Sequence, residues 1–402
     1  MVQTIIVSGP LSRGQITAGP AKGDALTSAG PAEPADPPDN DVFEWSWPDG
    51  PGGSHILARQ RELEVLLQDR VPILLDTIFW VMAREAAFGE RDDPELISLL
   101  GALRIAVESG KAFFPLTSDL IAEFSKQTPE RLEATMMLVD QLSLGIVMIP
   151  HHERMAAEVE AFFARAYPGH PPERRPLWTA YAFALGYEDV RLPGVTLDDS
   201  MRVGLAEKAW MMPPSVLVAS QSPDLFAAKH ESQRIAALLN EQEALHAAEI
   251  DSHATAIRIE VAGSASMITG VAAREYRRIA LAAGEHLDAT DIPNSHRVGR
   301  TIAGLIAQGL QQDVNRRLLG SLYVPAMLHA AVRSRAGRKL SANDIFDFRH
   351  AAAALPHCRA FFTDGPLRSL ITSRHVKLDA LYGCKVVSTP AEGIAFLEEL
   401  TL

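Results

Sequence analysis

One stretch of the chain, residues 343–364, reads NDIFDFRHAAAALPHCRAFFTD and decides how the rest is interpreted. Ser341 or Asn343 can cap a helix here, and its alanine run lets that helix pack closely against a neighbour. An apolar run of strand length follows and ends on Asp364, at the edge where α/β sheets place their chemistry. The stretch therefore predicts a helix and a strand that aim carboxylates at one place. The alternative is a solvated helix face followed by an ordinary turn aspartate.

The composition is that of a globular protein with a sizeable core. The 402 residues are 47% hydrophobic and 22% charged, which suits one large domain or two. The net charge of -12 argues against non-specific coating of nucleic acid or membrane, but leaves room for a local basic groove. The two cysteines, Cys358 and Cys384, lack metal-binding spacing and are too few for a disulfide framework. We expect a cytoplasmic protein with no membrane-spanning segment.

Short apolar runs alternate with helical patterns at both ends of the folded part. Buried strands are expected at residues 73–75, 112–116, 146–149, 360–363 and 385–388. This order predicts the α/β class, with a parallel sheet covered by helices on both faces.

The chain divides into four predicted segments. Residues 1–54 are rich in Pro, Gly, Ala and Asp, and we expect them to be disordered. Residues 55–166 and 341–402 together form the α/β domain. Residues 167–340 show helical patterns and no convincing run of strands, which predicts an all-helical insertion that interrupts this domain.

Acidic residues recur at or after the ends of the predicted strands. Asp76 follows the first strand, Glu123 lies in the helix after the second, and Asp364 follows the fourth. Asp347 lies in the helix that precedes the fourth strand. Converging carboxylates repel one another unless a cation lies between them, and Mg²⁺ and Mn²⁺ prefer carboxylate oxygen. The pattern predicts a Mg²⁺ or Mn²⁺ site.

The segments ILLDT, TSDLIAEF, DFRHAAAAL and FFTD, in this order, resemble those of the PIN-domain nucleases, which include the VapC-like toxins. The resemblance implies a three-layer α/β/α fold with a central parallel sheet, and a metal-dependent endoribonuclease that hydrolyses phosphodiester bonds. It also implies roles for residues of this chain. The metal-binding and catalytic acids would be Asp76, Glu123, Asp347 and Asp364, with Thr77 and Thr363 as supporting hydroxyls.

The sequence departs from the family's pattern at its last acid. That acid usually stands two positions after its threonine, whereas here Asp364 follows Thr363 directly. Two other acids lie one helical turn from the predicted ligands. Asp344 could replace Asp347, and Asp119 could replace Glu123.

Basic residues near the Asp347 helix are candidates for substrate binding. Arg349 and His350 lie just after Asp347, and the segment VRSRAGRKL carries further basic residues before it. Cations placed there could hold a phosphate backbone: Arg335, Arg338 and Lys339. The alternatives are a surface ion pair for Arg349, a core or helix position for His350, and a solvated loop for the others.

Two functional hypotheses follow from this resemblance. The first is an endoribonuclease that acts on single-stranded or structured RNA, and it is compatible with an inhibitory protein partner, a homodimer and a toxin-like role. The second is a catalytically inactive PIN-like protein that serves as an RNA-binding or protein-interaction module. Carboxylates of Asp76, Glu123 and Asp347 that lie close together in an open cleft would favour the enzyme. A cleft filled by the insertion, or dispersed carboxylates, would favour the module.

Overall fold

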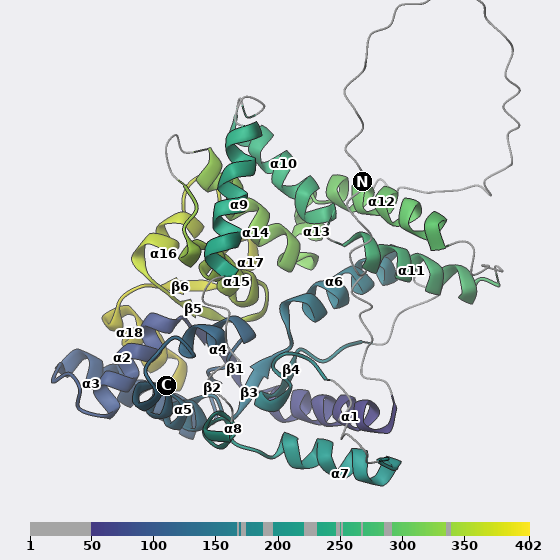
Figure 1. Cartoon of the computed structure of the whole chain (residues 1–402). Helices are drawn as coiled ribbons and strands as arrows, with labels where there is room; N and C mark the ends of the chain where they lie inside the picture. Colours follow the sequence, from purple (N-terminus) through teal and green to yellow (C-terminus); the bar gives the residue numbers. More distant parts are fainter. Residues whose placement is uncertain are drawn as a thin grey trace, which may run out of the picture. The chain divides into compact units, whose positions relative to one another are not determined.

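Four short apolar segments form a parallel sheet in the computed structural model of the chain (Figure 1). The strands are β1 (Val71–Leu75), β2 (Ala112–Phe113), β5 (Ala360–Phe362) and β6 (Lys385–Val387), in the spatial order β2-β1-β5-β6. Leu75 of β1 is paired with Phe362 of β5, so the carboxyl ends of these two central strands lie side by side. The predicted α/β class with a parallel sheet is confirmed.

The structure describes residues 50–166, 169, 174–187, 196–220, 231–246, 250, 252–266, 268–284, 292–334 and 339–402. Of the segment predicted to be disordered, residues 1–49 lie outside these ranges. Residues 50–54 begin helix α1 (Gly50–Leu67), so the prediction was wrong for them. Glycines fill these first turns, and the apolar helical pattern that marks the helix in the sequence starts only after them.

Helices connect the strands of the first part of the chain. They are α2 (Thr77–Ala87), α3 (Pro94–Glu108), α4 (Ser118–Phe124), α5 (Pro129–Leu142) and α6 (His151–Ala166). Side chains that precede them fix where they begin, because Asp76, Asp93 and Thr117 each accept a hydrogen bond from a backbone N–H of the first turn.

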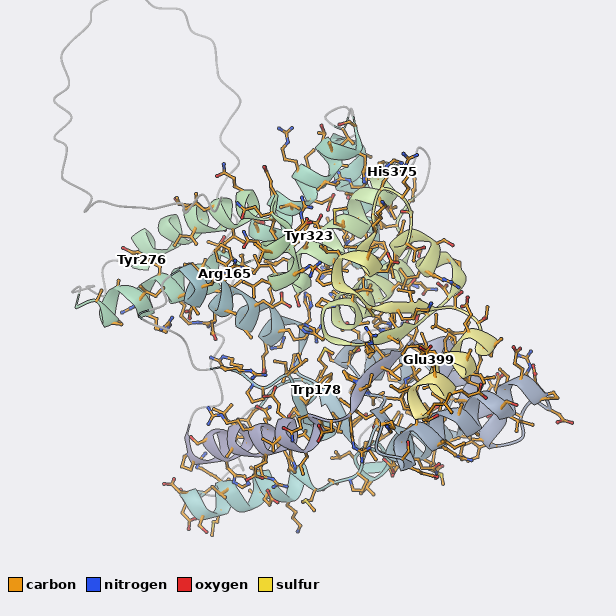
Figure 2. All side chains as sticks on the ribbon, turned by 180° about the vertical axis from the view of Figure 1, so that it is seen from behind. Arg165, Trp178, Tyr276, Tyr323, His375 and Glu399 are labelled. Atoms are coloured by element: carbon orange, nitrogen blue, oxygen red, sulfur yellow. The ribbon has the colours of Figure 1, made fainter. Side chains whose placement is uncertain are left out.

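The third predicted strand, β3 (Ile146–Met148), pairs antiparallel with β4 (Trp178–Ala180) in a separate sheet, so the prediction that it joins the parallel sheet was wrong. A parallel bridge between Leu116 and Val147 lies beside it. Since β4 falls within residues 167–340, the prediction of an all-helical insertion was wrong here. Trp178, which is labelled in Figure 2, lies on β4. Its indole packs edge-on against Phe113 of β2, with ring centroids 5.1 Å apart.

The rest of the described insertion is helical. It contains the 3₁₀ turn η1 (Tyr181–Phe183) and the helices α7 (Asp199–Trp210), α8 (Pro214–Ser220), α9 (Glu231–His246), α10 (His253–Ser266), α11 (Thr269–Ala282), α12 (Ile292–Gly309), α13 (Asp313–Leu318) and α14 (Gly320–Arg333). Four helices follow it: α15 (Ala342–His357), α16 (Gly365–Ile371), α17 (Leu378–Tyr382) and α18 (Pro390–Thr401).

Helix α15 packs closely between the insertion and the sheet. Its alanine run, residues 351–354, is fully buried, and the helix contacts α14 as well as β1 and β5. At Gly320 of α14 an added Cβ would lie 2.3 Å from the ring of Pro356, so the two helices could not approach this closely with a larger residue there. The close packing predicted from the alanines is confirmed, and it fixes the helix that carries Asp347.

Aromatic contacts join β5 to helices α2 and α18. The ring of Phe362 makes edge-on contacts with Phe79 of α2 and Phe396 of α18. An added Cβ at Gly393 would lie 2.9 Å from Phe362, so α18 needs a glycine where it meets the strand.

Among the described residues, no single helix is long and apolar enough to cross a membrane. One pair, α10 with α11, meets the length and composition criteria only when taken together across a bend of 58°.

Candidate metal centre

Asp76 lies at the centre of the site, at the end of β1 and the start of α2. Its Oδ1 accepts a hydrogen bond from the Thr77 N–H (2.6 Å), and its Oδ2 accepts one from the Thr363 hydroxyl (2.7 Å). Nδ1 of His350 lies 3.2 Å from Oδ1. Burial by itself raises the pKa of Asp76, but the hydrogen bond and charge of His350, with the Thr363 and Thr77 donors, lower it below its ordinary value. The sequence correctly placed this acid at the strand end.

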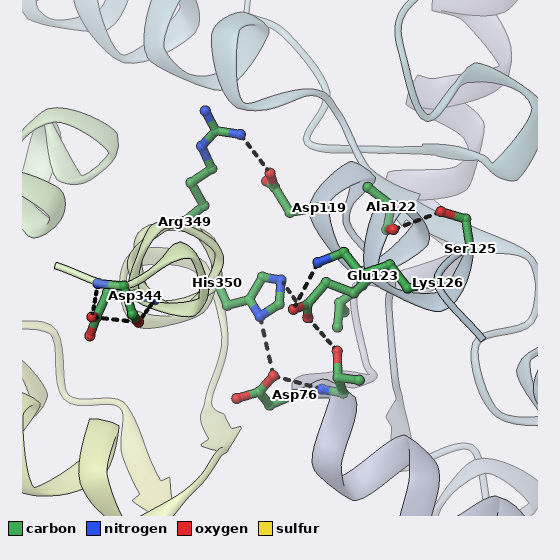
Figure 3. A network of polar contacts seen from close by, with 12 residues as sticks. Asp76, Asp119, Ala122, Glu123, Ser125, Lys126, Asp344, Arg349 and His350 are labelled. Carbon is green, nitrogen blue, oxygen red and sulfur yellow. Dashed lines mark hydrogen bonds and ion pairs between the residues drawn. The ribbon is translucent and has the colours of Figure 1, made fainter. Parts of the chain in front are cut away.

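Glu123 approaches the same point from α4. One of its oxygens, Oε2, accepts a hydrogen bond from the Thr77 hydroxyl (2.5 Å) and lies 3.7 Å from Nε2 of His350 (Figure 3). Each of the three side chains Asp76, Glu123 and His350 offers one ligand atom within 4.8 Å of the others. Nε2 is buried and has no hydrogen-bond partner. Once Nε2 is deprotonated, two carboxylates and this imidazole nitrogen form a donor set that fits a divalent cation.

His350 carries positive charge into the centre of this cluster. Its side chain is 0% exposed, and burial alone would lower its pKa. The hydrogen bond and charge of Asp76, together with the charges of Glu123 and Asp119, outweigh burial and raise the pKa to about 9. At neutral pH the ring is therefore an imidazolium that partly neutralises the surrounding carboxylates.

Asp347 and Asp364 complete the acidic cluster. Burial, followed by the negative charge of Asp76, raises the pKa of Asp347 to about 8; Asp364 and Glu123 add to this rise and His350 opposes it. Asp76, Glu123 and Asp364 are thus all within electrostatic range of Asp347. The carboxylate of Asp364 also caps α16 by accepting a hydrogen bond from the Leu367 N–H (2.8 Å).

The two alternative acids have structural partners. Asp119 is buried and pairs with Arg349 at 3.1 Å, while Asp344 forms a capping box with Ser341 at the start of α15. Both side chains therefore fix helix positions around the cluster, and the contacts with Thr77 and His350 belong to Glu123.

The predicted substrate-binding residues separate into three groups. Arg349 keeps 43% of its side chain exposed beside its partner Asp119, and Lys339 is exposed. Arg335 and Arg338 lie outside the described residues. His350 is fully buried in an ion pair with Asp76, and so it does not lie at a surface that a phosphate could reach.

Sequence reasoning missed one basic residue beside the acids. Nζ of Lys126 lies 3.8 Å from the ring centroid of Phe346 and 4.0 Å from Oε1 of Glu123. The cation–π contact holds the ammonium group next to the cluster. The spacing of three residues from Glu123 was the available signal, but Lys126 follows the end of α4, and its contact with Phe346 depends on how α4 meets α15.

No protein-family model matches the chain, and no curated protein or solved structure matches it. The parallel sheet and the contacts of the acidic cluster are therefore the features that bear on function.

Proposed function

We propose that the chain is a metal-dependent nuclease of the PIN-like type, an endoribonuclease that hydrolyses RNA phosphodiester bonds, built on a three-layer α/β/α domain. One observation carries the proposal: carboxylates from four separate segments converge beside the carboxyl ends of β1 and β5, where burial, together with the charges of the other three acids, raises the pKa of Asp347 to about 8. Like charges brought together in this way favour the binding of a compensating cation, which is the arrangement that a metal-dependent hydrolase uses.

Asp76 and Glu123 would hold Mg²⁺ or Mn²⁺, with Asp347 and Asp364 as the further acids of the site. When bound, such a cation lowers the pKa of a coordinated water and offsets negative charge on the phosphate. The hydroxyls orient the ligands, since Thr363 donates to Asp76 and Thr77 donates to Glu123. Asp347 holds its proton at neutral pH in the metal-free protein, and added positive charge would favour its carboxylate form.

The proposed substrate is single-stranded or structured RNA. Lys126 and Arg349 are cations beside the acids, and each is held in place, Lys126 by Phe346 and Arg349 by Asp119. Both could contact phosphates that flank the scissile bond. A cytoplasmic location, an inhibitory protein partner and a homodimer remain part of this proposal.

The alternative is an inactive PIN-like protein that binds RNA or a protein. One observation favours it. The His350 imidazolium lies between Asp76 and Glu123 and compensates both charges from within the chain, which lets the cluster persist without a metal.

Cleavage of single-stranded RNA and DNA oligonucleotides in Mn²⁺ or Mg²⁺ distinguishes these two functions. We expect metal-dependent RNA cleavage by the wild type and its loss in Asp76→Asn and Asp347→Asn. Asp93→Asn is the matched control, because Asp93 also caps a helix, accepting from the Glu95 N–H at 3.1 Å, but it does so at the start of α3. A folded wild type that binds RNA and cleaves nothing with either cation would refute the nuclease and support the module.

A further inference from the structure

We propose that His350 is itself a metal ligand, through Nε2, and that this nitrogen makes the site select first-row transition cations such as Mn²⁺ over Mg²⁺. This inference rests on the proposed metal-dependent function and specifies the cation. It assigns to His350 a contact with the metal in place of the phosphate contact expected from the sequence.

The orientation of the ring supports this assignment. Nδ1 lies 3.2 Å from Oδ1 of Asp76, whose carboxylate the Thr77 N–H and the Thr363 hydroxyl hold in place. A histidine that binds a metal through one nitrogen commonly directs its other N–H at a carboxylate, which fixes the ring. With Nδ1–H directed at Asp76, Nε2 is the position at which a cation would bind, so that here Asp76 orients the ring in place of contacting this cation directly, and Glu123 shares the cation with Nε2.

The surroundings of Nε2 point to a missing ligand. The atom is buried without a hydrogen-bond partner, and its nearest acidic neighbour, Oε2 of Glu123, is 3.7 Å away. That separation is too long for a hydrogen bond. Two donor atoms that bind one cation at about 2.1–2.2 Å lie about 3.0–3.6 Å apart when the angle between them is about 90–110°. The observed separation of 3.7 Å between Nε2 and Oε2 lies just above this range. A shift of a few tenths of an ångström would therefore let the two atoms share a cation.

The ligand types determine the selectivity. Mg²⁺ prefers oxygen ligands, whereas imidazole nitrogen suits transition metals, with Mn²⁺ the weakest binder of the divalent series. A site made of carboxylates alone would take either cation. A site that also contains the His350 nitrogen therefore favours Mn²⁺ and the transition cations that follow it.

The test uses the full chain and Mn²⁺ alone as the probe. Pulsed electron paramagnetic resonance of the Mn²⁺-loaded wild type should show coupling to a nitrogen nucleus, which requires no variant. His350→Gln offers an oxygen near the same place, so it should lose this coupling and bind Mn²⁺ at least about tenfold more weakly. The affinity for Mg²⁺, measured by competition, should change less.

His357→Gln is the matched control. His357 lies on the same helix, with Nε2 3.4 Å from a carboxylate oxygen of Glu158, away from the acidic cluster. This variant should keep both the nitrogen coupling and the Mn²⁺ affinity. Thermal unfolding establishes that both variants are folded.

The outcomes separate this inference from the proposed function. A wild type that cleaves RNA with Mn²⁺ but shows no nitrogen coupling overturns the role of His350 and leaves the nuclease standing. A wild type that shows the coupling but cleaves nothing supports the ligand and refutes the nuclease. A wild type that binds no Mn²⁺ overturns both.

Discussion

Two buried carboxylates face histidines of the same helix, and they differ in what surrounds them. His350 and His357 lie about two turns apart on α15. Nε2 of His357 is 3.4 Å from Glu158, and Ser321 donates to Glu158 from both its backbone N–H and its hydroxyl, each at 2.8 Å. Glu158 is therefore matched by donors and ties α6 to α14 and α15.

Asp76 also has its donors, but it shares its surroundings with other acids. Burial and the charges of Asp76, Asp364 and Glu123 are what raise the pKa of Asp347. A carboxylate whose oxygens accept hydrogen bonds from nearby donors stabilises the contact between helices. Carboxylates that lie close to one another instead have unbalanced negative charge, which favours the binding of a cation. The residues around each carboxylate–histidine pair thus distinguish the structural pair, Glu158 with His357, from the candidate functional pair, Asp76 with His350.

The largest expected effect tests this distinction directly. Asp76→Asn should lower the rate of Mn²⁺-dependent RNA cleavage at least about a hundredfold, because it weakens both the proposed metal site and the orientation of His350. Glu158→Gln keeps an acceptor oxygen for Ser321 and should leave the rate nearly unchanged. Initial rates measured on folded samples check this. An equal loss in both variants would remove the distinction between the two pairs.

The second prediction concerns pH and the metal-free protein. The pKa of Asp347 is raised from 3.8 to about 8, so the folded state retains a proton that the unfolded chain releases. This stabilisation is lost as the pH rises from about 4 to about 8, with a slope of up to about 1.4 kcal/mol per pH unit. His350, with its pKa raised to about 9, stabilises the fold fully below about 6.5 and loses that contribution as the pH rises through 9.

Asp347→Asn should therefore flatten the lower part of this dependence and make the metal-free protein more stable than the wild type at pH 8. Urea unfolding at pH 5, 6.5 and 8 measures the slope. Glu158→Gln serves as the comparison and should keep the wild-type slope. An Asp347→Asn variant that also kept it would mean that burial and the neighbouring acids do not raise the pKa of Asp347.

The smallest expected effect concerns the edge of the cluster. Lys126 lies beside Glu123 with 29% of its side chain exposed, and it is held by Phe346. Lys126→Met should raise KM for RNA about two- to fivefold and leave kcat unchanged, because a single partly exposed cation contributes about 0.5–1 kcal/mol. Lys111→Met is the control, since exposed Lys111 precedes β2 at the opposite end of the sheet. A change in kcat alone would contradict a binding role.

Much of the sheet could be predicted because its strands are apolar runs that end on polar capping residues. Ile73, Leu74 and Leu75 are fully buried and end on Asp76, which caps α2, so one short pattern specified both a strand and the start of a helix. Strand β4 was missed because it has three residues and stands in a segment, LWTAYAFAL, whose apolar spacing resembles that of a helix. Its pairing with β3 is a tertiary contact with no local signal.

The site could be predicted only in part, for the same reason. The acids at strand ends follow from topology, because parallel strands bring their carboxyl ends to one edge. The spacing of Asp347 and His350 puts them on one helix face, but it does not say that His350 is buried against Asp76. The burial of His350 against Asp76 depends on how α4 and β1 pack against α15, and so does the contact of Lys126 with Phe346.

The hydrogen bond between Thr363 and Asp76 joins positions that are 287 residues apart in the chain. During synthesis, β1 and its aspartate leave the ribosome long before the helix with His350 and the strand that ends at Thr363. Local helices of the insertion can form in that interval, whereas the acidic cluster must wait for this distant pairing. The centre is therefore assembled only after the 274 residues that separate Asp76 from His350 have been synthesised, and until then Asp76 lacks the partners that would make it a metal site.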